Sequence, residues 1–563
     1  MFFSTLTLAL CSTLPIQEPA PQPEIDFSGL IPASAVIIVR LESTEALLKT
    51  AQSITRVFSP GSPELPANWP FTDLNGIDVK GLDASRPFYI CWTIDHNGFQ
   101  SAGAFPANDS KKVVESLANE GFRTKVRDDW VGFSSAPTYA TTGTNEKVKS
   151  LLPGVVSAHI DLAALVTNFG HFVEIGLASA RDQMINAMEQ TPSPMDMEAV
   201  FDLYFDCLQQ VVQSAESLDI ALIDQGEQLT LHGSYRAKEG SALAGLMDPL
   251  PLPATLPVAI PSDAPISYVM VANMGALFTK FSPLFEDILE IYPEDLRDPL
   301  AEYMGMLPRM LKGFGNTTVG FGGFYSDGLK FDYFSEYQGD EEFAEVCKSM
   351  AAEANSYLAG MGSSIGEPSQ VEIDGIQVTQ MPITLDYDKL NAIFSTGLDQ
   401  GPGSDQLMDW MKIMYGEKPV VSMAQLGDRI WLHIGDAKQP LQQGVALLKA
   451  GPAPTTQTFA ALPGLPTSAH PFITYRMEMV SLMKALQPML ETSGLQFELP
   501  DTPLNMTTWM GINGRDFIGG FSIKPTEVKA FFDTVIGESP GNGSMIEPEY
   551  VGGTPPTVTH PKK

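Results

Sequence analysis

The sequence is poor in cysteine and in positive charge. Its 563 residues include four Cys, which excludes a scaffold built from disulfides. Lys and Arg number 34 against 67 Asp and Glu, so the formal net charge is −33. A field of that sign repels phosphate backbones and anionic lipid surfaces, and we therefore expect no nucleic-acid partner. The apolar fraction of 44% is still enough for large cores, and a chain of this length predicts several domains.

Long uncharged apolar runs are also scarce. At the N-terminus, residues 2–16 form one that is shorter than the ~20 residues of a membrane-spanning helix. Its length is typical of a secretory signal cleaved near Gln17 or Ala20. We therefore expect export to the periplasm, cell envelope or exterior, and no transmembrane span in the mature chain. Lipidation of Cys11 is an alternative, although Leu10 stands where that motif requires a small residue. A further alternative is that residues 2–16 form a buried first strand or helix of the fold.

The other three cysteines are widely spaced along the chain. Cys91, Cys207 and Cys347 each lie in an apolar context, within FYICWTI, YFDCLQQVV and FAEVCKSM. Cysteine in such surroundings behaves as a small buried hydrophobe, so we expect buried free thiols rather than a catalytic nucleophile.

One pattern recurs along the chain: a proline, a short β-rich run, then a run with apolar residues at helical spacing. Three copies place an apolar helix residue 15 or 16 positions after the proline, and a shorter copy begins at Pro153. The three full copies run from Pro32 to Leu47, Pro261 to Leu277 and Pro466 to Leu482. Each copy predicts a strand followed directly by a helix.

A second pattern follows these openers: two β-rich runs around a tight turn, then a helix. The turns contain Asp, Asn or Gly, which accept the positive φ that hairpins require. The turn glycines are Gly98, Gly226, Gly328 and Gly514, with a looser fifth turn at Gly427, and the first four precede helix residues Val113, Leu243, Phe343 and Val528. The sequence therefore predicts an α+β fold of repeated antiparallel β-hairpin plus helix units that form helix-covered sheets. Antiparallel hairpins disfavour a doubly wound nucleotide-binding fold.

Proline-rich stretches suggest domain boundaries, with six Pro between Asp248 and Pro265 alone. The predicted division is a signal at 1–17, a spacer at 18–27, an α+β repeat domain at 28–247, a linker at 248–265, a second repeat domain at 266–450, a third, compact repeat at 451–537 and a disordered tail at 538–563.

No motif predicts a catalytic, metal or cofactor site. The stretch from Gly362 to Gly366 matches G-x-S-x-G, but a helical run precedes it and a strand follows, the reverse of a nucleophile elbow. His159, His232 and His433 lie in β-rich runs, where each is expected on the polar face of a strand. The remaining weak matches, two Asp- and Asn-rich turns at 73–78 and 95–98 and the glycines at 313–323, lack the ligands or spacing of calcium and nucleotide loops.

Several predicted helices are apolar on more than one face, at 199–212, 276–292 and 302–313. One sheet can cover only one side of a helix, so the other side needs a neighbouring repeat, a second subunit or a lipid-like ligand. If the protein has a binding site, we expect it to be apolar, to lie between repeats and to be lined by the helices near 199–212 and 276–313.

The segments IPASAVIIVRLESTEALL, NGIDVKGLDASRPFYICWTI and AFPANDSKKVVESL resemble a loosely defined family of exported bacterial proteins of unknown function, abundant in planctomycete-like bacteria. The resemblance spans residues 28–135 and recurs weakly at 258–350 and 463–537. It implies export and α+β repeats, and it brings no activity or catalytic residues.

We therefore expect an exported, non-catalytic binding or scaffold protein of the bacterial envelope, with no cofactor and with a protein or an apolar molecule as its partner. The alternatives are a periplasmic or extracellular hydrolase whose site is assembled from distant residues, and a carrier of an apolar ligand such as a lipid. The sequence leaves the oligomeric state open.

Overall fold

The computed structural model provides the fold. The residues that it describes are 28–58, 79–95, 98–136, 145–149, 151–188, 197–245, 250–292, 294–325, 328–360, 362–387, 389, 418–436, 441–455, 468–492 and 498–537. The predicted signal, the spacer, the C-terminal tail and the turn at 73–78 lie outside these residues.

The strands form two large antiparallel sheets and a small two-stranded one. The eight-stranded sheet has the order β4 (Arg123–Arg127), β5 (Trp130–Ser134), β3 (Gly98–Pro106), β2 (Phe88–Asp95), β1 (Ala35–Leu41), β6 (Val156–Ile160), β7 (Ala215–Asp224) and β8 (Leu229–Ala237). The eleven-stranded sheet has the order β13 (Ser363–Ile365), β15 (Ile376–Leu385), β16 (Pro419–Leu426), β17 (Arg429–Asp436), β12 (Gly328–Tyr337), β11 (Phe314–Tyr325), β10 (Ile266–Val271), β19 (His470–Glu478), β20 (Asn505–Asn513) and β21 (Asp516–Ile523), and β14 (Ser369–Ile373) pairs with β15. The small sheet pairs β9 (Thr255–Leu256) with β18 (Ala453–Pro454).

The strands that open each predicted unit pair with one another. β1 pairs antiparallel with β6, and the hairpins β2–β3 and β7–β8 continue outward from that pair. In the same way β10 pairs with β19, flanked by β11–β12 and β20–β21. The two sheets adjoin along β8 and β21, where the Ala237 N–H donates to the Arg515 carbonyl at 3.2 Å. Across this boundary the Arg236 guanidinium donates to both carboxylate oxygens of Asp516 at 2.6 and 2.9 Å.

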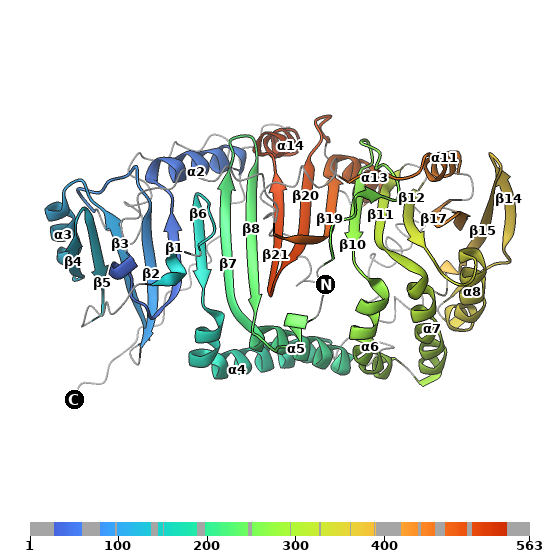
Figure 1. The fold of residues 1–563 in the computed structure, drawn as a ribbon, viewed down its shortest axis with the longest axis horizontal. Coiled ribbons are helices and arrows are strands. Elements are labelled where there is room, and N and C mark those ends of the chain that lie inside the picture. Colours follow the sequence, from blue (N-terminus) through green and yellow to red (C-terminus); the bar gives the residue numbers. More distant parts are fainter. Residues whose placement is uncertain are drawn as a thin grey trace.

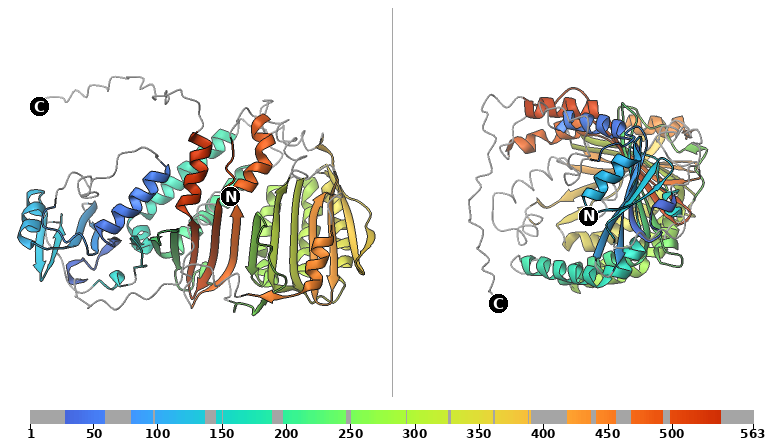
Figure 2. Two further views of the ribbon diagram at one scale, coloured as in Figure 1. Left: turned by 90° about the horizontal axis from the view of Figure 1, so that it is seen from above. Right: turned by 90° about the vertical axis from the view of Figure 1, so that its left-hand side faces the viewer.

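The helices gather at the two ends of the strands (Figure 1). Along one end lie α2 (Thr44–Phe58), α14 (Pro525–Gly537), α13 (Met479–Thr492) and α11 (Gln442–Ala450). Along the other lie α4 (Leu162–Met188), α5 (Met197–Gln213), α6 (Met274–Ile291), α7 (Glu294–Gly313) and α8 (Phe343–Gly360), while α3 (Ser110–Asn119) covers the outer strands β4 and β5. Viewed end-on in Figure 2, α2 and α14 project from the same side of the sheet as α4 and α5.

The predicted hairpin turns are present, and their glycines have the backbone conformation that was expected. Gly98, Gly226, Gly328, Gly427 and Gly514 have φ values of 101°, 82°, 103°, 63° and 64°. These values lie in the region that L-residues with a Cβ rarely adopt, so glycine is favoured at the tip of each hairpin. A helix follows four of the five hairpins. The exception is the predicted helix at Leu243, where only a short 3₁₀ turn, Leu243–Gly245, is found.

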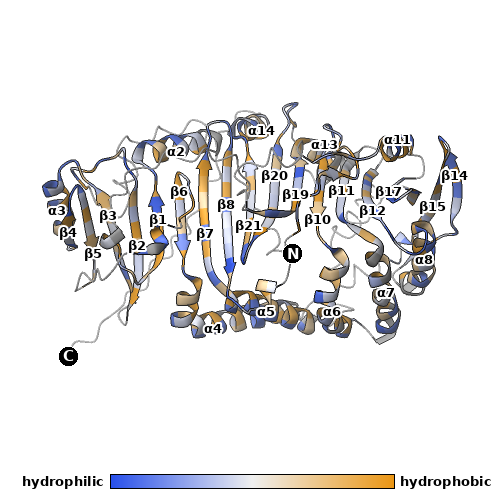
Figure 3. Ribbon diagram, viewed as in Figure 1, coloured by the Kyte–Doolittle hydropathy of each residue, from blue (hydrophilic) through white to orange (hydrophobic). Residues whose placement is uncertain are grey.

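Both faces of the eleven-stranded sheet are buried at its outer end. Trp431, fully buried on β17, packs with Val445 and Leu448 of α11 on one face. On the other face Ile430 and Met423 pack with α8. In Figure 3, strands such as β7 and β10 are predominantly hydrophobic, whereas the helices carry both hydrophobic and hydrophilic residues.

The fold class is therefore α+β with antiparallel sheets, as the sequence predicts. Among the described residues, α4 alone is long and apolar enough to cross a membrane by length and composition, with a mean hydropathy of 1.3 over Leu162–Asn186. Its outward positions include Asn168, Glu174, Asp182 and Gln183, all exposed. Buried in hydrocarbon these groups would need partners, so no strong transmembrane span is evident in this part of the chain.

Candidate apolar binding site

Helix α6 is fixed at both ends by polar contacts. Its N-terminal residue follows strand β10, and the Asn273 side chain accepts a hydrogen bond from the Ala276 N–H at 2.8 Å. At the C-terminal end the Arg297 guanidinium donates to the Tyr292 and Glu290 carbonyls, both at 2.7 Å. These caps satisfy backbone groups that a helix end leaves without partners. Helix α6 therefore has a defined position beside the sheet.

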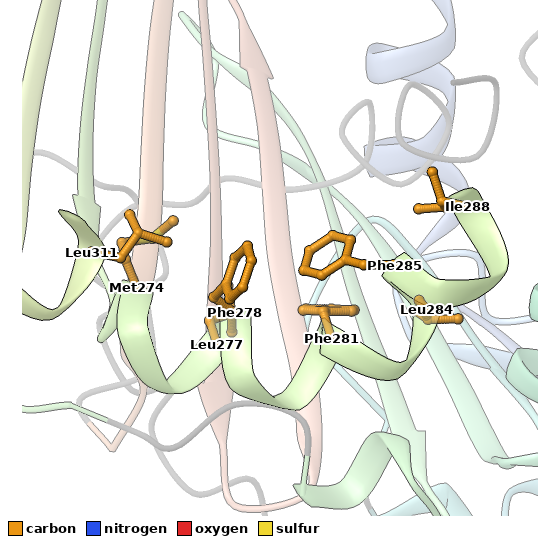
Figure 4. A pocket seen from close by; sticks show the side chains of 8 residues that line it. All are labelled: Met274, Leu277, Phe278, Phe281, Leu284, Phe285, Ile288 and Leu311. Atoms are coloured by element: carbon orange, nitrogen blue, oxygen red, sulfur yellow. The ribbon is translucent and has the colours of Figure 1, made fainter. Parts of the chain in front are cut away.

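One face of α6 lines a pocket of about 340 Å³. The lining consists entirely of apolar side chains: Met274, Leu277, Phe278, Phe281, Leu284, Phe285 and Ile288 of α6, and Leu311 of α7. Figure 4 shows these side chains on the side of the helix that faces the space in front of the strands. Their spacing of three or four residues places them in one stripe over four helical turns.

The stripe is neither core nor solvent-exposed surface. All eight lining residues are half-buried, whereas Thr279, Ser282 and Pro283 on the opposite side of α6 are exposed. The rings of Phe278 and Phe285 approach to 4.6 Å between centroids, so part of the stripe packs on itself. A surface of this kind still exposes apolar area that a ligand could remove from water.

Helix α5, the other helix of the expected site, lines no part of this pocket. It lies between α4 and α6 and contacts both. Phe201 and Phe205 are buried, and Leu203, Leu208 and Val212 are half-buried. Helix α5 therefore packs against two neighbouring helices, and several of its apolar residues stay half-buried. Of the helices expected to line a binding site, those at 276–313 contribute to this pocket and the one at 199–212 does not.

The structure also pairs two histidines with aspartates that sequence inspection had missed. His159 Nδ1 lies 2.8 Å from Asp219 Oδ1, and His433 Nδ1 lies 3.0 Å from Asp332 Oδ1. The three histidines lie in strands β6, β8 and β17, as expected, and all three are buried. The partners are 60 and 101 residues apart in sequence, and only the strand register could have revealed them.

His433 lies between Asp332 on one neighbouring strand and Ser422 on the other. These are the three residue types of a Ser-His-Asp catalytic triad, side by side. The geometry does not support that role. Ser422 is fully buried, and its hydroxyl accepts from the Gln380 side chain at 3.4 Å. His433 Nε2 has no hydrogen-bond partner, and Asp332 Oδ1 also accepts from Trp431 Nε1 at 2.6 Å. A nucleophile must be reached by substrate and bonded to its base, and neither condition is met.

The remaining sequence candidates have structural explanations. Residues Ser363–Ile365 of the G-x-S-x-G stretch form strand β13 after helix α8, the reversed context that was expected. Cys91 and Cys347 are buried free thiols, as expected, and burial raises the pKa of each to about 12. Cys207 is also a free thiol, but it is half-buried, so the expectation of burial was wrong for this residue. The neighbouring Lys348 donates to Glu345 at 2.6 Å. Across the described residues, no three His, Cys, Asp or Glu side chains are grouped so as to hold a metal ion.

Comparison with known proteins gives no family. No family model and no curated protein matches the chain. Among solved structures, crystal forms III and IV of TP0453 are similar at 9% and 10% identity, each with a TM-score of 0.22. They cover 49% and 52% of this chain, and 96% and 98% of their own. A likeness this weak carries no functional argument, and the resemblance to exported bacterial proteins stays a prediction.

Proposed function

We propose that this protein is an exported, non-catalytic binding protein of the bacterial envelope that holds an apolar molecule in the α6 pocket. The observation that carries the proposal is the lining itself. Eight half-buried apolar side chains line a pocket of about 340 Å³, and none of them is ionisable. Such a site can bind by burial of apolar surface, and it offers no acid, base or nucleophile for a reaction.

The hydrolase alternative has less support. Its strongest candidates, the His159–Asp219 and His433–Asp332 pairs, lie within the sheets and contribute nothing to the pocket lining. A catalytic His–Asp pair needs a nucleophile or a bound water within hydrogen-bond reach of a substrate. The buried Ser422 beside His433 does not provide one.

We also propose that the α+β architecture arose by repetition of one strand–helix–hairpin unit. Its support is the equivalent use of the opening strands, since β1 pairs with β6 as β10 pairs with β19. On this view the pocket is formed by α6, the helix that follows the opening strand β10 of one unit, together with α7, which has no counterpart in the predicted unit.

Binding is tested with the uncharged dye Nile red, whose fluorescence rises in apolar surroundings. We expect saturable binding, weakened about tenfold or more by Phe281→Ser, because burial of a large apolar side chain is worth ~1.5–3 kcal/mol. Phe172→Ser is the matched control, since Phe172 lies on α4 and is 70% exposed. Equal affinity of both variants and the original protein would contradict the proposal, provided that circular dichroism shows both variants folded.

Export is tested separately by a reporter fused after residue 27 and expressed in a bacterial host. The apolar run at 2–16 predicts cleavage and transfer of the reporter out of the cytoplasm. A reporter that remains cytoplasmic and uncleaved would show that this part of the proposal is wrong.

A further inference from the structure

We infer that copies of this protein associate end to end, with edge strand β4 of one copy pairing with edge strand β14 of the next. This inference does not depend on the α6 pocket. Figure 1 places β4 and β14 at opposite ends of the long axis of the molecule. Among the described strands, β4 pairs with β5 alone and β14 pairs with β15 alone. Each end of the molecule therefore presents the open side of an edge strand, where backbone groups can accept another strand.

The register of each edge strand shows which backbone groups point outward. Both strands join their partner through a two-residue turn, with Arg127 opposite Trp130 and Ile373 opposite Ile376. Residues that flank such a turn bond to each other, and bonded positions then alternate with positions whose N–H and C=O point away from the partner. The outward positions are Thr124 and Val126 on β4, and Gln370 and Glu372 on β14. Antiparallel pairing of the two edges can thus form about four hydrogen bonds.

Both edges are accessible. Val126 is 49% exposed although α3 packs against β4, and the first four residues of β14, Ser369 to Glu372, are all exposed. Val126 and Val371 are large apolar side chains that the described surface leaves in water. A strand added at either edge would remove part of that apolar area from water.

The direction of the strands allows the pairing to continue from copy to copy. Neighbouring strands are antiparallel within each sheet and also where the two sheets adjoin, since Arg236 donates to Asp516 while Gln228 donates to Ser522. The row from β4 to β14 contains an even number of strands, so its two outermost strands run in opposite directions. A copy displaced along the row, apart from the twist of the sheet, therefore brings its β4 antiparallel to β14 of the first copy.

The two edges carry opposite charge. Strand β4 has three basic side chains and no acidic one, and all three are exposed: Arg123, Lys125 and Arg127. The segment 366–385, which contains β14, has three acidic side chains and no basic one, and all three are exposed: Glu367, Glu372 and Asp374. Opposite charges across a pair of strands stabilise the pair, and like charges directly opposite each other destabilise it.

Charge also selects this pairing over the two symmetric ones. An antiparallel contact between two β4 strands would set the basic side chains of one copy against those of the other, and a contact between two β14 strands would bring the acidic segments together. Charged edge residues ordinarily keep sheets apart in this way, but the protection fails where one edge is basic and the other acidic. Because the contact joins different surfaces at opposite ends, it produces open chains of increasing length rather than a dimer.

The test is sedimentation velocity of the mature protein in about 0.15 M NaCl, where the Debye length of about 8 Å screens repulsion between the remaining charges. The association should be weak, because two five-residue strands bury far less than the ~1,200 Å² of a stable interface. We expect the mean sedimentation coefficient to rise continuously between about 1 and about 500 µM protein. A protein that stays monomeric over this range, or that stops at a dimer, overturns the inference.

Charge reversal at each edge makes the test specific to β4 and β14. Reversing the first edge with Arg123→Glu and Lys125→Glu, or the second with Glu367→Lys and Glu372→Lys, should weaken association by at least about tenfold. An equimolar mixture of the two variants should associate again, because the acidic β4 of one then meets the basic β14 segment of the other. Association of the mixture would also show that both variants are folded.

The matched control changes the same charge away from the edges. Lys49→Glu with Lys484→Glu alters two exposed lysines on α2 and α13, and this variant should associate as the original protein does. If the control is weakened as much as the edge variants, or if the mixture of edge variants stays monomeric, the edge strands do not form the contact.

Discussion

Replacing Trp431 by alanine should destabilise the eleven-stranded sheet by about 3–5 kcal/mol, the usual cost of removing a fully buried aromatic side chain. Trp431 is 0% exposed and lies under α11, where a Cβ on Gly444 would come within 2.2 Å of the indole ring. Because the α11 backbone lies this close to the indole, the cavity left by Trp431→Ala could be filled only if the helix moved. Urea denaturation followed by circular dichroism measures the loss as a lower midpoint.

A second substitution separates packing from hydrogen bonding at the same position. Trp431→Phe keeps an aromatic ring but removes the donor that Asp332 Oδ1 accepts at 2.6 Å, so we expect a smaller cost of about 1–3 kcal/mol. Phe172→Ala, at an exposed position, should change stability by no more than about 0.5 kcal/mol. A Trp431→Ala loss below 1 kcal/mol, on the scale of surface changes, would mean that α11 does not pack on β17 as described.

Acidification should cost the protein stability through His232. This side chain is 4% exposed on β8, and burial lowers the pKa of its imidazole from 6.5 to about 4, partly offset by the Asp219 carboxylate. A histidine with a lowered pKa favours the fold in its neutral form. The contribution of His232 to the free energy of unfolding is therefore complete above about pH 6.5 and is lost as pH decreases toward 4. The total loss is about 3 kcal/mol, and stability does not change further through this group below pH 4.

The measurement compares the pH dependence of unfolding in the original protein and in His232→Phe. Phenylalanine retains an aromatic neighbour for Trp509, whose ring centroid lies 6.1 Å from that of His232, and it does not titrate. We expect the two proteins to have similar stability near pH 8 and the variant to retain more of it at pH 4.5. His171→Phe, at an exposed position on α4, is the control. Parallel pH profiles for all three proteins would show that His232 does not carry the effect.

The features that sequence could predict are the local ones. Hairpin turns depend on a few adjacent residues, so Gly98, Gly226, Gly328 and Gly514 identified them. Strand–helix openers follow from hydrophobic periodicity in the same way. The segment at Leu243 fails as a helix because only a few residues separate it from the proline-rich stretch that follows, too few for a stable helix without tertiary packing.

The pocket and the histidine pairs required three-dimensional information. The apolar excess of α6 was visible in the sequence, but whether a core, a helix or a ligand covers it depends on where α7 and the sheet lie. Likewise, the partner of His433 is fixed by the register of β12 against β17, which periodicity does not determine. The apolar character of the site was therefore predictable, and its shape was not.

The position of β20 and β21 has a consequence for how the molecule assembles. These strands come last in the chain, yet they lie between β8 of one sheet and β19 of the other. Until residue 523 is available, β8 and β19 each present an open edge, and contacts between such distant segments form slowly. The two sheets should therefore reach their native arrangement only after β21 has been synthesised. A truncation before β20 should yield a protein that self-associates through its unpaired edges rather than a shorter soluble one.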